Sequence, residues 1–242
     1  MDTIKLKSGN VKMIAHRGLS GVERENTYPA FVAAGNRSYY GIETDVHKTA
    51  DGNFVIIHDE TTERVSLGKV NINVETSDYV QLENIVLPDF DESMGRQDIR
   101  IPLLIDYIKI CKRYNKVCVL ELKNAFVKDD IKRIIEEFKS VEYLENAIFI
   151  SFNLQNCIIL RSLLPENDIQ WLLMDKVTEE VIKVLAENKL DLDIYYKYLT
   201  KEVVEKLHLQ GIKVNCWTCD DKEDAEKLSE MGVDFITSNI IE

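Results

Sequence analysis

The chain has 242 residues, of which 45% are hydrophobic and 30% charged, a composition suited to one soluble globular domain with a sizeable core. Its formal net charge of −12 works against binding to nucleic acids and anionic membranes, although a bound cation and a few basic residues still permit a small anionic substrate. The five cysteines are odd in number and irregularly spaced, which excludes a simple disulfide framework, and the Cys216-x-x-Cys219 motif lacks the second pair of a zinc site. We interpret them as reduced thiols.

The N-terminal stretch is polar and has no apolar run of the kind found in signal peptides, and no later run is long enough for a membrane helix. These features predict a cytoplasmic protein with no integral membrane segment. They also favour a small substrate over a nucleic-acid partner. The sequence does not indicate an oligomeric state.

Short β-branched runs alternate with amphipathic stretches along the whole chain. Helical patterns include residues 129–139, 178–188, 201–209 and 222–231, with left-handed caps expected at Gly211 and Gly232. Eight strands separated by helices predict a TIM-type (β/α)8 barrel. A doubly wound open sheet is the alternative, and it fits less well because no G-x-G-x-x-G loop follows the first strand. The strands are expected at residues 11–15, 41–46, 116–122, 147–152, 169–174, 193–198, 213–218 and 235–237.

Two features interrupt this repeat. Residues 53–58 form an additional apolar run, and the Asp51-Gly52 pair before it is typical of a hairpin turn, so the second strand is expected to fold back locally. Residues 60–101 are polar, irregular and too long for an ordinary βα loop. We interpret them as an insertion over the barrel mouth after the second strand, with short strands near 70–74, in a chain whose residues 1–242 form a single TIM-barrel domain. The last strand lies so near the end that no full eighth helix is expected.

Acidic residues gather on two of the predicted strands. Glu43 and Asp45 are two apart on a strand and therefore share a face, which His47 also shares, while Glu121 and Lys123 share a face at the end of another strand. Buried carboxylates of this kind suit a hard divalent cation with oxygen ligands. The alternatives are an exposed edge strand with solvated acids and a simple Glu–Lys pair at a strand end.

Two histidines fall at the predicted C-terminal ends of strands, where catalytic groups of barrel enzymes collect. His16 is followed by Arg17, which suits phosphate binding, and by Gly18, which permits a tight turn. His58 ends the apolar run at residues 53–58 and precedes Asp59. Both histidines have the side-chain chemistry of proton transfer near neutral pH.

These residues, taken in order, resemble the signature of the glycerophosphodiester phosphodiesterase family. The match is dense from residue 14 to residue 59 and returns at residues 121–123, 217–218 and 233–237. The matching residues are His16-Arg17-Gly18, Glu25-Asn26-Thr27, Ala30-Phe31, Ala34, Gly41, Glu43-x-Asp45-Val46, Thr49, Asp51-Gly52, Val55, His58-Asp59, Glu121-Leu122-Lys123, Trp217-Thr218 and Val233-Asp234-x-Ile236-Thr237.

The resemblance implies a role for each matching residue. Glu43, Asp45 and Glu121 would bind the divalent cation, which would be Mg²⁺ or Ca²⁺, with Mn²⁺ as a further candidate. His16 and His58 would be the catalytic general acid and base. Arg17 and Lys123 would hold the phosphate, Glu25 would line the site and support the metal or Arg17, and Trp217 would form an apolar wall beside the glycerol or alcohol group. An alternative for Trp217 is a core residue of the barrel. Asn26, with Pro29 close behind it, is expected to begin the first helix.

The sequence departs from the family pattern in several places. Arg24 stands where the family has a proline, whose loss alters the stiffness of that loop, and Asp220 replaces an expected asparagine. The runs at residues 62–65 and 101–106 also differ from the family's Leu-x-Arg-Thr and Ile-Pro-Thr-Leu-Glu-Glu. None of these changes removes a proposed metal ligand or histidine, so they bear on the substrate more than on the activity.

The implied reaction is metal-dependent hydrolysis of a glycerophosphodiester to glycerol 3-phosphate and an alcohol by general acid/base catalysis. One alternative is a lysophospholipase D-like phosphodiesterase. A second is a non-catalytic barrel that binds phosphodiesters, against which the complete set of acids and histidines argues.

Overall fold

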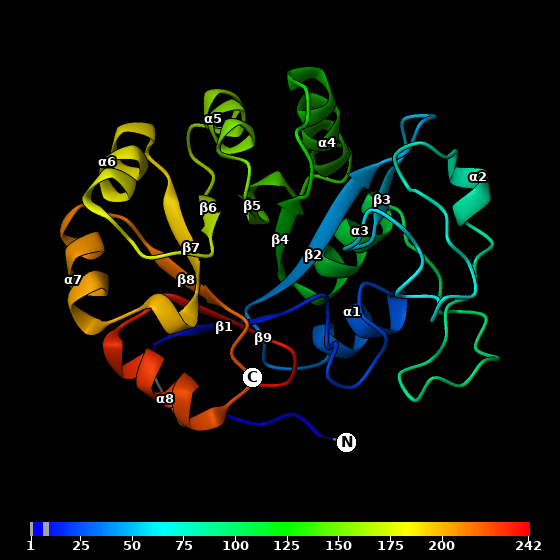
Figure 1. Cartoon of the computed structure of the whole chain (residues 1–242), viewed down its shortest axis with the longest axis horizontal. Helices are drawn as coiled ribbons and strands as arrows, with labels where there is room; N and C mark the ends of the chain where they lie inside the picture. Colours follow the sequence, from blue (N-terminus) through cyan, green and yellow to red (C-terminus); the bar gives the residue numbers. More distant parts are fainter. Residues whose placement is uncertain (1, 7–9) are drawn as a thin grey trace.

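The fold is a closed barrel of parallel strands, described over residues 2–6 and 10–242 in a computed structural model (Figure 1). Eight strands follow one another around the ring in the order β1-β9-β8-β7-β6-β5-β4-β2, and the pairing of Ile14 with Gly41 joins β2 back to β1. The predicted TIM-type barrel is therefore confirmed, and the open sheet is excluded because the first two strands pair. The strands are β1 Lys12–Ala15, β2 Gly41–Lys48, β4 Val117–Leu122, β5 Ala147–Ser151, β6 Ile169–Leu173, β7 Asp191–Tyr195, β8 Val214–Trp217 and β9 Phe235–Ser238.

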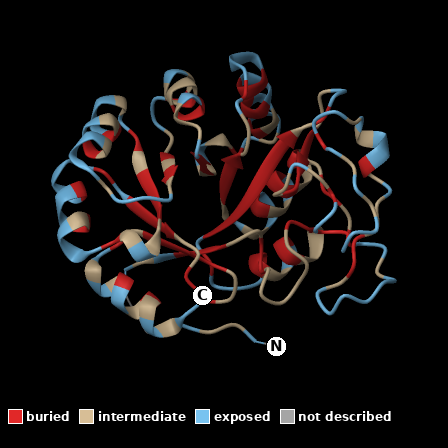
Figure 2. Cartoon of the chain, viewed as in Figure 1, coloured by how far each residue is buried: buried red, intermediate tan, exposed pale blue. Residues whose placement is uncertain are grey.

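Helices surround the barrel, with their exposed residues outward and their buried residues toward the strands (Figures 1 and 2). In α4 the predicted apolar stripe is buried, and α8 ends at Gly232, which takes the left-handed conformation expected for a cap. No helix follows β9 within the described residues, and none of their helices combines the length and apolar character needed to cross a membrane. The helices that connect strands are α1 Tyr28–Gly35, α3 Leu104–Tyr114, α4 Lys128–Ser140, α5 Leu154–Leu163, α6 Glu179–Asn188, α7 Lys201–Leu209 and α8 Lys222–Met231, with 3-10 turns at Leu144–Asn146 and Tyr196–Tyr198.

The sixth barrel strand, β7, begins and ends earlier than its sequence suggests. β7 ends at Tyr195, and Tyr196–Tyr198 form a 3-10 turn in place of the predicted strand. The tight turn brings the ring of Tyr195 against the rings of Tyr196 and Tyr198, with centroids 5.4 and 6.0 Å apart. A run of tyrosines has high strand propensity, but here the aromatic contacts favour the turn.

The second strand folds back as predicted. β3, at Phe54–Ile56, pairs antiparallel with the end of β2 and lies outside the ring. Gly52 in the connecting turn has φ +85°, a conformation that glycine adopts without strain.

Residues 60–101 extend from the β2–β3 side of the barrel, where Figure 1 shows them as the cyan and green loops. The predicted strands near 70–74 are wrong: the segment contains one isolated bridge, between Thr61 and Asn73, and one short helix, α2, at Tyr79–Leu82. The segment nevertheless has a core of its own that packs on β3. Its buried members are Val55, Ile57, Val65, Val74, Leu82, Leu87, Ile99 and Ile101.

Candidate active site

A pocket with about 390 Å³ of empty space opens at the C-terminal ends of the barrel strands. Apolar side chains inside the barrel, including Ile150 and Leu172, form its floor. The placement agrees with the rule that barrel enzymes build their sites at this end. The pocket is lined by His16, Arg17, Glu43, His58, Glu121, Lys123, Ile150, Phe152, Leu172, Asp193, Trp217 and Thr237.

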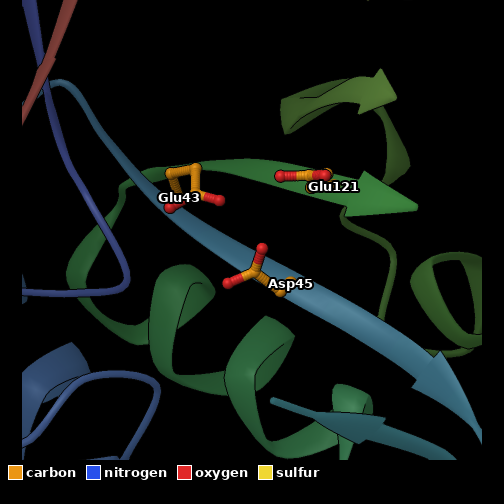
Figure 3. A group of neighbouring side chains, drawn as sticks. All are labelled: Glu43, Asp45 and Glu121. Carbon is orange, nitrogen blue, oxygen red and sulfur yellow. The ribbon is translucent and has the colours of Figure 1, made fainter. Parts of the chain in front are cut away.

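Three acids from neighbouring strands converge at one side of this pocket (Figure 3). Glu43 and Asp45 project from β2, and Glu121 projects from β4, where it pairs in register with Asp45. One carboxylate oxygen from each lies within 4.8 Å of the others, and the residues are only 3%, 1% and 7% exposed. This grouping excludes the alternative of an exposed strand with solvated acids, and it could hold a metal ion.

Asp45 is held in place by an unexpected partner. Asn26 donates from Nδ2 to Asp45 Oδ2 at 2.8 Å and accepts a hydrogen bond from Thr44 through Oδ1. The prediction that Asn26 begins the first helix is wrong, because its φ of 55° places it in the left-handed region and Thr27 precedes the helix instead. The buried amide orients a carboxylate and leaves the capping position to its neighbour.

The turn after β1 brings a cation over the acids. Arg17 has a positive φ of 53°, and its backbone N–H donates to Glu43 Oε2 at 2.8 Å. Gly18 follows with φ +77°, and a Cβ atom on it would lie 2.7 Å from the backbone of Ala30. Only glycine fits this position, because any side chain would collide with helix α1.

Lys123 lies between two of the acids. Its Nζ is 2.9 Å from Glu121 Oε1 and 3.4 Å from Asp45 Oδ1. Arg17 approaches Asp45 from another direction, with Nε at 3.6 Å from Oδ2. The positive charges of Arg17 and Lys123 therefore offset part of the negative charge of the three acids.

The acids respond differently to this environment. Burial and the nearby Asp45 raise the pKa of Glu43 well above its usual range, and the same two causes raise the pKa of Glu121 to about 7. Burial also opposes ionisation of Asp45, but Lys123 and Arg17 outweigh it and lower the pKa of Asp45. Glu43 and Glu121 therefore hold protons more readily than free carboxyl groups do, and a nearby cation would favour their ionised forms.

The two histidines face the same pocket but have different partners. His16 Nδ1 lies 2.8 Å from Asn239 Oδ1, and its Nε2 lies 4.0 Å from Glu43 Oε2. His58 Nδ1 lies 2.6 Å from Asp59 Oδ1. Burial and Arg17 lower the pKa of His16 to about 4, and burial also lowers the pKa of His58.

Asn239 and Asp220 are residues that the sequence analysis did not assign to the site. Asp220 accepts from Asn239 Nδ2 at 2.5 Å, which orients the amide so that its oxygen faces His16. Ser20 donates to the same oxygen at 2.7 Å. The sequence offered one signal for this pair, the replacement of the family's asparagine by Asp220. It offered none for Asn239, because residues 16 and 239 come together only when the barrel closes.

Arg64 is a second residue that the sequence analysis missed. It donates to both carboxylate oxygens of Glu25 at 2.8 Å and to Asp59 Oδ2 at 2.6 Å. Glu25 in turn accepts from Arg17 at 2.9 Å. Arg64 therefore links the partner of His58 with the partner of Arg17, and its place in the family's Leu-x-Arg-Thr run was the available signal.

The remaining candidates occupy distinct positions. Glu25 lies beside Arg17, outside the group of three acids and outside the lining of the main pocket. Trp217 lines the pocket, where Phe152 packs edge-on against its ring at 5.6 Å. His47 is buried against Glu75 and Asn124 and does not line the pocket. All five cysteines are buried free thiols.

Comparison with known proteins decides the family. Residues 16–242 match the family model of the glycerophosphoryl diester phosphodiesterase family. The chain belongs to this family. A glycerophosphodiester phosphodiesterase from Caldanaerobacter subterraneus is 29% identical over 229 residues, covering 94% of this chain and 93% of the relative. A second, from Bacillus altitudinis, is 28% identical over 236 residues, covering 93% of each.

Solved structures agree with this assignment. A phosphodiesterase from Oleispira antarctica, in complex with the product sn-glycerol-3-phosphate, superposes with a TM-score of 0.86 at 25% identity, covering 95% of this chain and 93% of that one. A glycerophosphodiester phosphodiesterase from Parabacteroides distasonis superposes with a TM-score of 0.80 at 28% identity, covering 96% and 94%. The predicted family is confirmed, and this member of the glycerophosphoryl diester phosphodiesterases is an enzyme.

Proposed function

We propose that the enzyme hydrolyses glycerophosphodiesters to glycerol 3-phosphate and an alcohol, using a divalent cation held by Glu43, Asp45 and Glu121. The observation that carries the proposal is the convergence of these buried acids with two cations and two histidines in one pocket. The product complex of the Oleispira antarctica phosphodiesterase supports glycerol 3-phosphate as the retained product.

The three acids fit a hard cation. Asp45 Oδ1 is buried without a hydrogen-bond partner among the described residues, and the donor set consists of carboxylate oxygens, the ligands that Mg²⁺, Ca²⁺ and Mn²⁺ prefer. When bound, the cation supplies Lewis-acid stabilisation of charge on the phosphoryl oxygens.

Arg17 and Lys123 are placed to hold the phosphate. The buried Nε of Arg17 has no hydrogen-bond partner among the described residues, although Asp45 and Glu25 raise the pKa of this guanidinium against the effect of burial. A charged donor without an acceptor suits an incoming phosphate oxygen. Lys123 stays charged for the same reason, since Asp45 and Glu121 outweigh the effect of burial on its pKa.

The partners of the histidines assign their roles within the proposal. Asn239 Oδ1 is an acceptor, so the proton of neutral His16 lies on Nδ1 and its Nε2 is free to accept a proton from the nucleophile. Asp59 is an anion beside His58 Nδ1, and it stabilises the protonated ring that delivers a proton to the leaving alkoxide. We therefore assign His16 as the general base and His58 as the general acid.

The opposite wall of the pocket accommodates the alcohol portions of the substrate. Trp217 and Phe152 offer aromatic surface, and Leu172 and Ile150 form an apolar floor that excludes water beneath the phosphate. In this proposal Glu25 acts indirectly, because it holds Arg17 in place.

The experiment is turnover of glycerophosphocholine by the purified protein with Mg²⁺, Ca²⁺, Mn²⁺ or EDTA. We expect cation-dependent release of glycerol 3-phosphate, abolished in Glu43→Gln and reduced by about 10²–10⁴ in His16→Ala. Glu136→Gln, an exposed acid on α4, is the matched control and should keep full activity. Turnover of lysophosphatidylcholine in place of glycerophosphocholine would redirect the substrate to a lipid, and no turnover of either would contradict the proposal.

A further inference from the structure

The two halves of the pocket differ in chemistry. The side formed by β1, β2 and β4 carries the charged groups described above. The side formed by β5 to β9 is apolar or aromatic, apart from Thr237 and one acid, Asp193 on β7. In the closed ring β7 lies four strands from β2 in either direction, so Asp193 stands across the barrel from Glu43 and Asp45.

The side chain of Asp193 is buried, but no side chain of a described residue stabilises it there through a hydrogen bond or an ion pair. It is only 1% exposed, its Oδ1 is buried without a hydrogen-bond partner, and it forms no ion pair with any described residue. A buried polar atom is destabilising unless it finds a partner, so an orphaned carboxylate oxygen at the wall of a pocket points to a ligand.

A second orphaned atom lies on the neighbouring strand. Asp193 pairs in register with Asn215 of β8, and Trp217 follows two residues later on the same face. Its indole Nε1 is also buried without a partner among the described residues. The ring is fixed in place by Phe152, at 5.6 Å, and Tyr195, at 5.9 Å.

The acceptor Asp193 Oδ1 and the donor Trp217 Nε1, on adjacent strands, can both form hydrogen bonds with a single hydroxyl group. A hydroxyl donates to a carboxylate oxygen and accepts from an indole N–H, so both orphaned atoms gain a partner. An ammonium group would leave the indole N–H unsatisfied. Burial, together with Glu121, raises the pKa of Asp193 well above its usual range, which also favours a neutral partner over a cation.

We propose that Asp193 and Trp217 bind the terminal hydroxyl of the substrate's glycerol portion, and that Asp193 determines specificity for it. The inference rests on the proposed function. The terminal hydroxyl is the group of glycerol farthest from the phosphate, so with the phosphate at Arg17 and Lys123 it would extend across the barrel from the acids of β2. The apolar floor at Leu172 receives the carbon chain between them.

The test compares glycerophosphocholine with 2-hydroxypropyl phosphocholine, which lacks only the terminal hydroxyl and keeps the one beside the ester. Asp193→Leu should lower kcat/KM for glycerophosphocholine by about 10- to 100-fold and leave kcat/KM for the analogue within about threefold. Asp193→Asn retains an acceptor oxygen and should lose less. Asp191→Asn is the control: it lies on the same strand outside this pocket, and should not change the ratio between the substrates.

An equal loss on both substrates would overturn the proposal, because Asp193 would then act on the phosphate side or on folding. Unchanged kinetics would overturn it as well, since Oδ1 would then hold only a structural water. If the wild type turns over neither substrate, the proposed function fails. The hydroxyl subsite formed by Asp193 and Trp217 is then tested separately, by calorimetry of the binding of sn-glycerol 3-phosphate and of 2-hydroxypropyl phosphate. Tighter binding of glycerol 3-phosphate, lost in Asp193→Leu, would support the subsite, and equal binding of both would overturn it.

Discussion

His16 and His58, the proposed base and acid, differ in the side chain that contacts each ring. Both project into the same pocket, but one Nδ1 faces a neutral amide and the other a carboxylate. Burial lowers the pKa of both rings, Arg17 lowers the pKa of His16 further, and the Asp59 carboxylate favours the imidazolium form of His58. This difference in partners supports the proposed roles of His16 as base and His58 as acid.

The assignment of the acid predicts a dependence on the leaving group. His58→Ala should lower kcat for glycerophosphocholine by about 10²–10⁴, because the choline alkoxide needs a proton as it leaves. With a p-nitrophenyl ester of glycerol 3-phosphate the loss should fall below about 10-fold, because nitrophenolate leaves without one. His16→Ala should lose activity on both substrates. Equal losses in the two variants on each ester would contradict the assignment.

Asn239 is predicted to position His16. Asn239→Ala removes the acceptor for Nδ1, so the ring can rotate and change tautomer, and kcat should fall by about 10- to 100-fold while KM changes less than about threefold. The thermal shift produced by Ca²⁺ should stay as in the wild type, since the three acids are untouched. Ser20→Ala is the control, because Ser20 shares the same oxygen without contacting the imidazole ring through its side chain. A larger KM effect than kcat effect would indicate a role in binding instead.

At the scale of elements, the loop before α1 is tied to the insertion. Arg24 donates to the carbonyls of Pro88 and Asp89 at 2.8 and 2.7 Å. The family's proline would stiffen this loop internally, whereas Arg24 fastens it to a neighbouring segment. Because Glu25 follows directly and holds Arg17, the insertion helps to position the arginine that we propose binds the phosphate.

This coupling predicts a change in local dynamics. Arg24→Ala should speed hydrogen exchange by about 10- to 100-fold in residues 19–27 and 85–93, because each lost charged hydrogen bond contributes about 1.5–3 kcal/mol. KM should rise modestly with the freedom of Arg17. Arg100→Ala also removes a bond to an insertion carbonyl, that of Glu83, but it should leave residues 19–27 unchanged. If residues 19–27 kept their wild-type protection from hydrogen exchange in Arg24→Ala, the hydrogen bonds from Arg24 to Pro88 and Asp89 would be unimportant for this loop.

Local patterns determined how much of this architecture was predictable. Alternating β-branched runs located the barrel strands, and the period-2 spacing placed Glu43 and Asp45 on one face. Tyr196–Tyr198 were misread because aromatic propensity resembles that of a strand, and the core of the insertion was missed because its apolar residues follow no period. Asn239 and Asp193 were missed for another reason, since their place in the site depends on ring closure between residues far apart in sequence.

At the scale of the whole molecule, closure of the barrel assembles the site from residues far apart in the sequence. His16, which directly follows β1, is oriented by Asn239, which follows β9, so the histidine is held only when the first and last strands pair. The acids of β2 and β4 are assembled by the parallel pairing of Asp45 with Glu121. Folding therefore concentrates negative charge at one end of the barrel, and the free energy of unfolding must depend on what neutralises it.

The contribution of the three acids to the stability of the metal-free protein should accordingly fall with rising pH and recover with a cation. Between about pH 6.5 and 8, folded Glu121, whose pKa is about 7, still binds protons that its unfolded form has lost, so the folded state binds more protons and raising the pH destabilises it. His16 and His58 oppose this trend below about pH 7.5, because their lowered pKa values leave them neutral in the folded state while the unfolded imidazoles, with a pKa of about 6.5, still bind protons. The double variant His16→Ala/His58→Ala removes this opposing contribution. Calorimetry of this double variant in EDTA should show Tm decreasing by a few degrees over this range, and Ca²⁺ should raise its Tm more at pH 8 than at pH 6.5, because the acids must be ionised to bind it. Glu121→Gln should flatten both dependences; a variant that kept them would show that other groups control the charge at the barrel mouth.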